Sequence, residues 1–116
     1  MAALKITHYA EAGIPVMKLE GKINLDEGSV ILREAIDDYL YNRGTKQLII
    51  EMGNLYYADS SGIGEIFTGL SRGKKAGCRI VYANIAKKII DLLTITKLLT
   101  VLEVYPSVQE AARSFK

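Results

Sequence analysis

The spacing of apolar residues along this 116-residue chain predicts short strands that alternate with amphipathic helices. Two strand-like runs, Leu4 to Tyr9 and Ile14 to Leu19, flank Ala12 and Gly13, which suit a tight turn. We therefore expect the chain to open with a β-hairpin.

A capping box predicts the first helix, because Asn24 is followed three residues later by Glu27. Gly44 suits the left-handed residue that ends such a helix. The expected apolar face of this helix consists of Leu32, Ala35, Ile36, Tyr39 and Leu40.

Three later segments are predicted to be strands. Leu48 to Met52 and Arg79 to Ala83 are largely continuous apolar runs, which are typical of strands covered on both faces. Val101 to Tyr105 is expected to form a short last strand.

Helices are expected from Ser61 to Ala76, from Ala86 to Leu93, and after Ser107, which has capping-box spacing with Glu110. The resulting order of elements predicts an α/β fold: one mixed central sheet with an N-terminal hairpin, parallel inner strands and about four helices. We expect residues 1–116 to form a single domain.

Charge and composition disfavour several classes of protein, including nucleic-acid-binding, membrane-spanning and secreted proteins. The net charge is only +2, which disfavours nucleic-acid binding. No run approaches the roughly 18 apolar residues of a membrane span, and the N-terminus lacks the apolar region of a signal peptide. Cys78 is the lone cysteine, which excludes an internal disulfide and fits a reducing compartment. We therefore expect a cytoplasmic protein with no membrane span and no nucleic-acid partner.

The segment richest in chemistry lies where an apolar run gives way to a helix. It reads Asp59, Ser60, Ser61, Gly62, Ile63 and Gly64, and Ile63, Ile66, Phe67 and Leu70 form the apolar stripe of the helix. Asp and Ser cap helix starts, and the unpaired N–H groups of a first helical turn also suit a phosphate. Ser60 and Ser61 are therefore each either a cap or an acceptor of a regulatory phosphate.

Residues around this segment leave two further alternatives open. Gly62 and Gly64 either permit close approach of another chain or allow tight packing of the helix on the sheet. Tyr56 and Tyr57 suit either a protein interface or packing along the strand.

Catalytic and metal-binding classes are disfavoured by what the chain lacks. A serine hydrolase needs a base, usually histidine, and the only histidine, His8, lies in the first predicted strand. No cluster of His, Cys and carboxylate residues suggests a metal site. We expect a binding protein with no catalytic residues, no metal and no cofactor.

Five segments resemble the STAS domains of anti-sigma factor antagonists. They are Gly21 to Leu25, Leu48 to Met52, Tyr57 to Gly64, Gly77 to Val81 and Val104 to Ala111. The similarity extends from about Leu4 to Phe115 and implies a small α/β fold that serves as a protein–protein switch.

The resemblance also implies partners and site residues. In this family a partner that is both anti-sigma factor and serine kinase phosphorylates the first serine of the motif. The unphosphorylated protein binds this partner and frees the sigma factor, and a serine phosphatase resets the switch. Carried over by position, Ser60 is the acceptor and Ser61 the second candidate. The partner-binding motif then comprises Asp59, Ser60, Ser61, Gly62, Ile63 and Gly64.

A phosphate on Ser60 would place about −1.5 to −2 charge beside Asp59, with Glu65 about one turn further on. Like charges brought together in an interface cost several kcal/mol, which is enough to release a partner. The alternative is a non-switching STAS subunit of a stress-sensing or lipid-transport complex, in which Ser60 is only a cap. The sequence leaves the oligomeric state open.

Overall fold

A computed structural model describes residues 4–24 and 27–116 of the chain. The elements are β1 (Leu4–Glu11), β2 (Ile14–Ile23), α1 (Gly28–Asp37), the π-helix η1 (Asp38–Asn42), β3 (Gln47–Ala58), α2 (Ser60–Lys75), β4 (Arg79–Ala83), α3 (Lys87–Ile95), the 3-10 helix η2 (Leu99–Val101), β5 (Val104–Tyr105) and α4 (Val108–Arg113). Every predicted strand and helix is present, although several begin or end at other residues.

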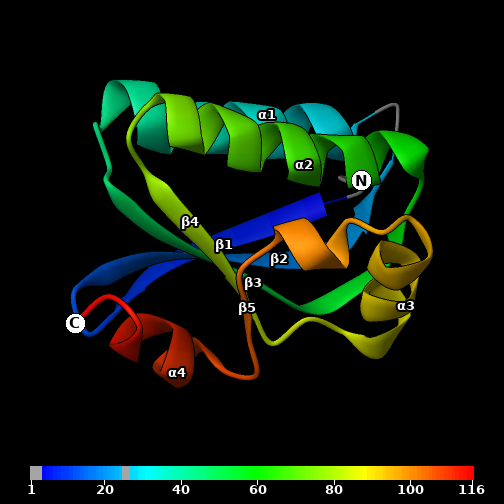
Figure 1. The fold of residues 1–116 in the computed structure, drawn as a ribbon. Coiled ribbons are helices and arrows are strands. Elements are labelled where there is room, and N and C mark those ends of the chain that lie inside the picture. The colour runs from blue at the N-terminus through cyan, green and yellow to red at the C-terminus, as the bar shows by residue number, and fades with distance from the viewer. Residues whose placement is uncertain (1–3, 25–26) are drawn as a thin grey trace.

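The five strands form one mixed sheet in the order β1-β2-β3-β4-β5 (Figure 1). β1 is antiparallel to β2, whereas the other neighbouring pairs are parallel. Ala12 and Gly13 join β1 to β2 with φ of 53° and 83°, the left-handed backbone of a tight hairpin turn. The structure thus confirms the predicted hairpin and the parallel inner strands.

The helices cover both faces of the sheet and so create two cores. In Figure 1, α1 and α2 lie side by side over one face, α4 lies against the other, and α3 closes one end. Leu48 and Ile50 of β3 pack into the larger core beneath α1 and α2, while Ile49 between them packs into the smaller core with α4. Because side chains alternate along a strand, this division explains why the apolar run of β3 is continuous.

The first helix begins later than the capping-box spacing suggests. Asn24 Oδ1 accepts from the backbone N–H of Gly28 at 3.1 Å and, at 3.4 Å, from that of Glu27. The side chain of Asn24 therefore does satisfy N–H groups that precede α1, but the helix itself starts at Gly28. Leu25, in the segment that resembles the STAS family, lies outside the described residues. The predicted left-handed role of Gly44 is confirmed by its φ of 61°.

β3 is longer than the expected Leu48 to Met52, because its second half pairs with the extended end of β2. Ile23, the last residue of β2, lies opposite Ala58, and the register shifts between Gly21 and Lys22. β4 pairs only with the first half of β3, as far as Glu51. The carboxyl end of β3 therefore extends past β4 and carries the Asp59 segment to the margin of the domain.

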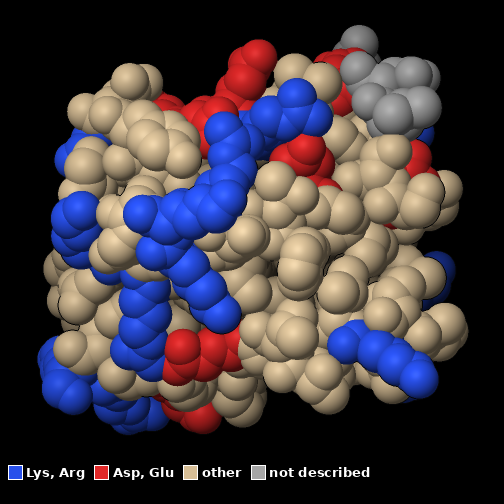
Figure 2. All heavy atoms as spheres, turned by 45° about the horizontal axis from the view of Figure 1, so that its top comes forward, with Lys and Arg blue, Asp and Glu red and all other residues tan. Residues whose placement is uncertain are grey.

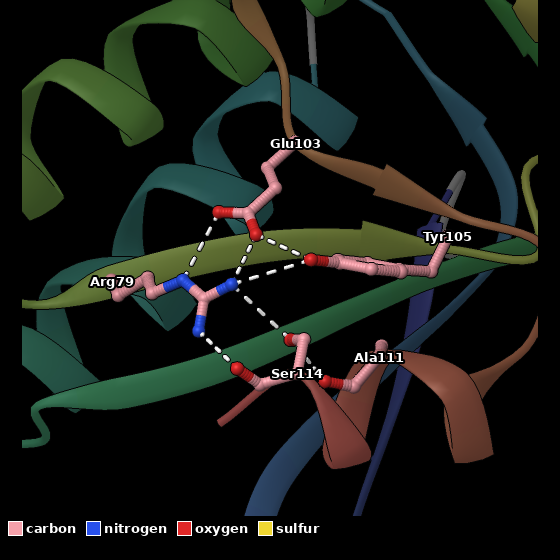
Figure 3. A network of polar contacts seen from close by, with 5 residues as sticks. All are labelled: Arg79, Glu103, Tyr105, Ala111 and Ser114. Carbon is pink, nitrogen blue, oxygen red and sulfur yellow. Dashed lines mark hydrogen bonds and ion pairs between the residues drawn. The ribbon is translucent and has the colours of Figure 1, made fainter. Parts of the chain in front are cut away.

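A polar network centred on Arg79 holds the C-terminus against the sheet (Figure 3). The Arg79 guanidinium donates to both carboxylate oxygens of Glu103, one of them from Nε at 3.0 Å, and to the Ser114 carbonyl at 2.9 Å. Tyr105 OH donates to Glu103 at 2.6 Å, and the guanidinium stacks 4.5 Å from the Phe115 ring centroid. One side chain at the start of β4 thus links β5 to the end of α4.

We expect Arg79→Met to lower the free energy of unfolding by about 1–2 kcal/mol, because it removes these charge-assisted bonds but keeps the aliphatic stem. Amides of α4 should exchange hydrogen faster than in the wild type, whereas those of β3 should not change, since α4 loses an attachment and β3 does not. Arg113→Met, an exposed change on α4, is the matched control and should stay within about 0.5 kcal/mol of wild type. Equal effects of the two substitutions would contradict the linking role.

Candidate functional site

The start of α2 is fixed by Asp59, which is the N-cap of the helix. Its backbone is extended, and its Oδ1 accepts from the Gly62 N–H at 2.9 Å. The backbone N–H of Asp59 donates to the Ile23 carbonyl at 3.2 Å, which ties this cap to the end of β2. Asp59 rather than a serine therefore fills the capping role that the sequence left open among these residues.

Two glycines hold the end of β2 between two helix starts. A Cβ atom on Gly62 would lie 2.3 Å from the Ile23 carbonyl oxygen and 2.8 Å from Ile23 Cβ. A Cβ atom on Gly28, at the start of α1, would lie 2.5 Å from the Lys22 carbonyl oxygen. Gly62 thus serves helix–sheet packing, whereas a Cβ on Gly64 would meet open space. Tight packing of the helix on the sheet therefore accounts for Gly62 but not for Gly64.

The two serines differ in their exposure. Ser60 is the first residue of α2 and is exposed, while Ser61 is half-buried. Near the end of β3, Tyr56 and Tyr57 are 61% and 48% exposed, so neither is buried in the sheet. Ser60 is therefore the more accessible hydroxyl of the pair.

An apolar groove of about 530 Å³ opens beside Ser60, between α2 and the α3–η2 segment. Its lining comprises Ala58, Asp59, Ser60, Ile63, Gly64, Phe67, Leu92, Thr96 and Leu98. In Figure 2, the surface of the α2 face toward α3 is largely uncharged, whereas Lys and Arg side chains gather toward the other end of that face. A hydroxyl on the rim of a largely apolar groove is a site where adding a phosphate changes the surface strongly.

One residue of the expected apolar stripe of α2 is not buried in the core. Ile63, Ile66 and Leu70 are buried as the spacing predicts, but Phe67 is 45% exposed and lines the groove. Sequence reasoning missed the groove because its second wall comes from Leu92 and Leu98, which are distant in the chain. The one available signal was the apolar residue Phe67, which the period assigned to the core.

Glu65 does not add to the exposed negative charge of the site as expected. It is only 9% exposed, and its Oε1 accepts from Arg33 Nε at 2.9 Å and Nη2 at 2.7 Å. The Arg33 side chain on α1 therefore neutralises it and links the two helices. Of the two carboxylates that the sequence placed near Ser60, only Asp59 faces the groove.

Other chemically reactive side chains lie away from this groove. His8 is on β1 and its Nδ1 is 2.7 Å from Tyr39 OH in η1, which follows the end of α1 opposite to Gly28. Cys78 is buried, and burial raises the pKa of its thiol. Among the described residues, no group of His, Cys, Asp and Glu could hold a metal ion. No helix within residues 4–24 and 27–116 is long and apolar enough to span a membrane.

The match to a family model shows the family to which this fold belongs. The model of the STAS domain matches residues 6–111, nearly the whole chain. The protein belongs to the STAS domain family, as the five segments between Gly21 and Ala111 predicted.

Solved structures that resemble the chain include regulators and a transporter. An anti-sigma factor antagonist from Mycobacterium paratuberculosis is 18% identical, with TM-score 0.73 over 98% of this chain and 97% of that one. The phosphorylated form of the Bacillus cell fate determinant SpoIIAA is 16% identical, with TM-score 0.70 over 98% of this chain and 100% of that one. The murine anion transporter Slc26a9 is 20% identical, with TM-score 0.75 over 90% of this chain and 18% of that one. At these identities, the likeness concerns the fold.

Proposed function

We propose that this STAS domain is an anti-sigma factor antagonist whose binding is controlled by phosphorylation of Ser60. In its unphosphorylated form it binds an anti-sigma factor that is also a serine kinase, and phosphorylation by that partner releases it. A serine phosphatase restores the binding form. The exposed position of Ser60 on the rim of the apolar groove is the observation that carries this proposal.

The start of α2 suits a phosphate that leaves the fold intact. A helix N-terminus presents N–H groups and partial positive charge to an anion. The Gly62 contact and the Asp59 cap already fix the backbone there, so a phosphate on the exposed Ser60 changes the surface rather than the packing. We therefore expect phosphorylated and unphosphorylated protein to unfold at similar temperatures.

A phosphate on Ser60 would release the partner because the partner would have to cover it. A partner seated in the groove would bury the phosphate on its rim, and burying a charge without a counter-charge is strongly unfavourable. Asp59 lies on the same rim and adds repulsion from a like charge. The presence or absence of the phosphate on Ser60 would thus decide between binding and release, and this switch would need no catalytic residue of this chain. The proposal places the switch in the cytoplasm, where sigma factors act.

The acceptor is tested with the kinase that co-purifies from the source cells. Ser60→Ala should abolish phosphate incorporation, while Ser61→Ala, the matched change one residue on, should be phosphorylated at close to the wild-type rate. Intact-mass measurement reads both results directly. Phosphorylation of Ser60→Ala at the wild-type rate would refute Ser60 as the acceptor.

A second candidate function is a non-switching STAS subunit of a stress-sensing or lipid-transport complex, or of another membrane transporter. The similarity to a domain within an anion transporter favours it, because that likeness covers most of this chain. Here Ser60 would carry no phosphate and a substitution of it would leave assembly unchanged. Intact mass of protein isolated from its native cells, under conditions that turn the sigma factor on and off, separates the two functions.

A further inference from the structure

The two edges of the sheet differ greatly. β5 has only two residues, Val104 and Tyr105, which is a short edge of the kind that resists pairing with other chains. β1 has eight residues, and Thr7, His8, Tyr9 and Ala10 in its middle are all exposed. No other strand of the described chain pairs with its outer edge. The long edge therefore offers a row of backbone donors and acceptors to a further strand.

β1 also lacks most of the usual features that block edge pairing. It contains no proline, and its register with β2 runs without a bulge from Leu4 to Glu11. Its only charged residues are Lys5 and Glu11, one near each end. Between them lies a five-residue stretch without Lys, Arg, Asp or Glu, so the middle of the strand carries no such charge to repel a second strand.

We propose that β1 pairs antiparallel with β1 of a second copy of this chain, about a two-fold axis that passes through His8. The two five-stranded sheets would then join into one continuous sheet. Most soluble oligomers have such closed two-fold symmetry, in which the same patch is used on both subunits.

The charged residues of β1 determine through which residue the two-fold axis passes. In an antiparallel ladder, directly opposite residues project to the same face, so the axis passes through a residue rather than between two. With the axis at His8, Lys5 lies opposite Glu11 of the partner subunit, and the same pair forms a second time by symmetry. With the axis at Thr7, Lys5 lies opposite Tyr9 of the partner subunit and Glu11 has no opposite charge within β1. Only the His8 register makes the strand complementary to itself in charge.

This edge is separate from the proposed phosphorylation site. β1 and β3 are divided by β2, and Ser60 follows the end of β3. The dimer therefore leaves both copies of the apolar groove outside the joined strands, and its test does not depend on the function of Ser60.

Sedimentation velocity of the wild-type protein over a wide concentration range should show a reversible dimer. Lys5→Glu and Glu11→Lys each replace two attractive pairs by two like-charge pairs, so each should raise the dimer dissociation constant at least about tenfold. The double variant Lys5→Glu/Glu11→Lys restores opposite charges and should return to within about threefold of wild type.

The sharpest outcome comes from mixing the two single variants. Each fails to pair with itself, but the Lys5→Glu and Glu11→Lys chains are complementary to one another and should form a heterodimer. Lys88→Glu, an exposed change of the same charge on α3, should dimerise as wild type does. Circular dichroism should show that every variant is folded. A wild-type protein that stays monomeric, or single variants that dimerise normally or fail to pair when mixed, would overturn the proposal.

Discussion

Replacing Gly62 by alanine is expected to lower the free energy of unfolding by about 3 kcal/mol, the upper end of the usual cost of overpacking. The added methyl would stand 2.3 Å from a carbonyl oxygen and 2.8 Å from the Cβ of Ile23. Neither atom belongs to a flexible chain end, so the start of α2 must move away from β2. For a domain of this size, the midpoint of thermal unfolding should fall by roughly 10–15 °C.

The matched control is Gly64→Ala, two residues further along the same helix. A Cβ at Gly64 meets no atom within 4 Å. Alanine is favoured over glycine in a helix by about 0.8–1.0 kcal/mol, so this variant should be slightly more stable than wild type. Chemical denaturation of the three proteins gives the comparison. The same methyl group is thus expected to have opposite effects on stability at the two positions. A Gly64→Ala variant less stable than wild type would show that helix propensity does not determine the effect of this substitution.

The order of strands and helices was predictable because it depends on local patterns. The turn at Ala12 and Gly13 follows from residue types that tolerate positive φ, and the start of α2 follows from a cap beside apolar residues at helical spacing. In contrast, the extension of β3 to Ala58 depends on pairing with β2, which lies more than twenty residues earlier in the chain. Such long-range pairing leaves no periodic signal of its own.

The candidate site was located by its motif, but its surroundings were not. Phe67 fits a buried helical stripe by spacing, yet it lines an open groove between α2 and the segment from Leu92 to Leu98. Glu65 reads as a surface charge by type, yet Arg33 on α1 neutralises it. Both outcomes depend on how two helices lie relative to α2. The residues Asp59 to Gly64 could thus be named from the sequence, but their electrostatic environment could not.

That environment leads to the strongest functional expectation, which concerns Ser60→Asp. We expect this variant to bind the co-purifying anti-sigma factor about 100-fold more weakly than wild type, which corresponds to about 2.7 kcal/mol. The new carboxylate would join Asp59 on the rim of an apolar groove, where a bound partner must cover both charges. Isothermal titration calorimetry with the purified partner measures the change. Ser60→Ala should keep wild-type affinity, because it adds no charge.

Thr68→Asp serves as the matched charge control, since Thr68 is exposed on α2 but does not line the groove. Thr68→Asp should weaken binding by less than about threefold, as expected for a charge that lies outside the surface covered by the partner. If both aspartate variants lose affinity equally, net charge rather than position governs binding. If Ser60→Asp binds as wild type does, a charge at this position does not control the partner. Because aspartate carries less charge than a phosphate, true phosphorylation should weaken binding further than Ser60→Asp, and comparing the two measures how much of the release depends on charge.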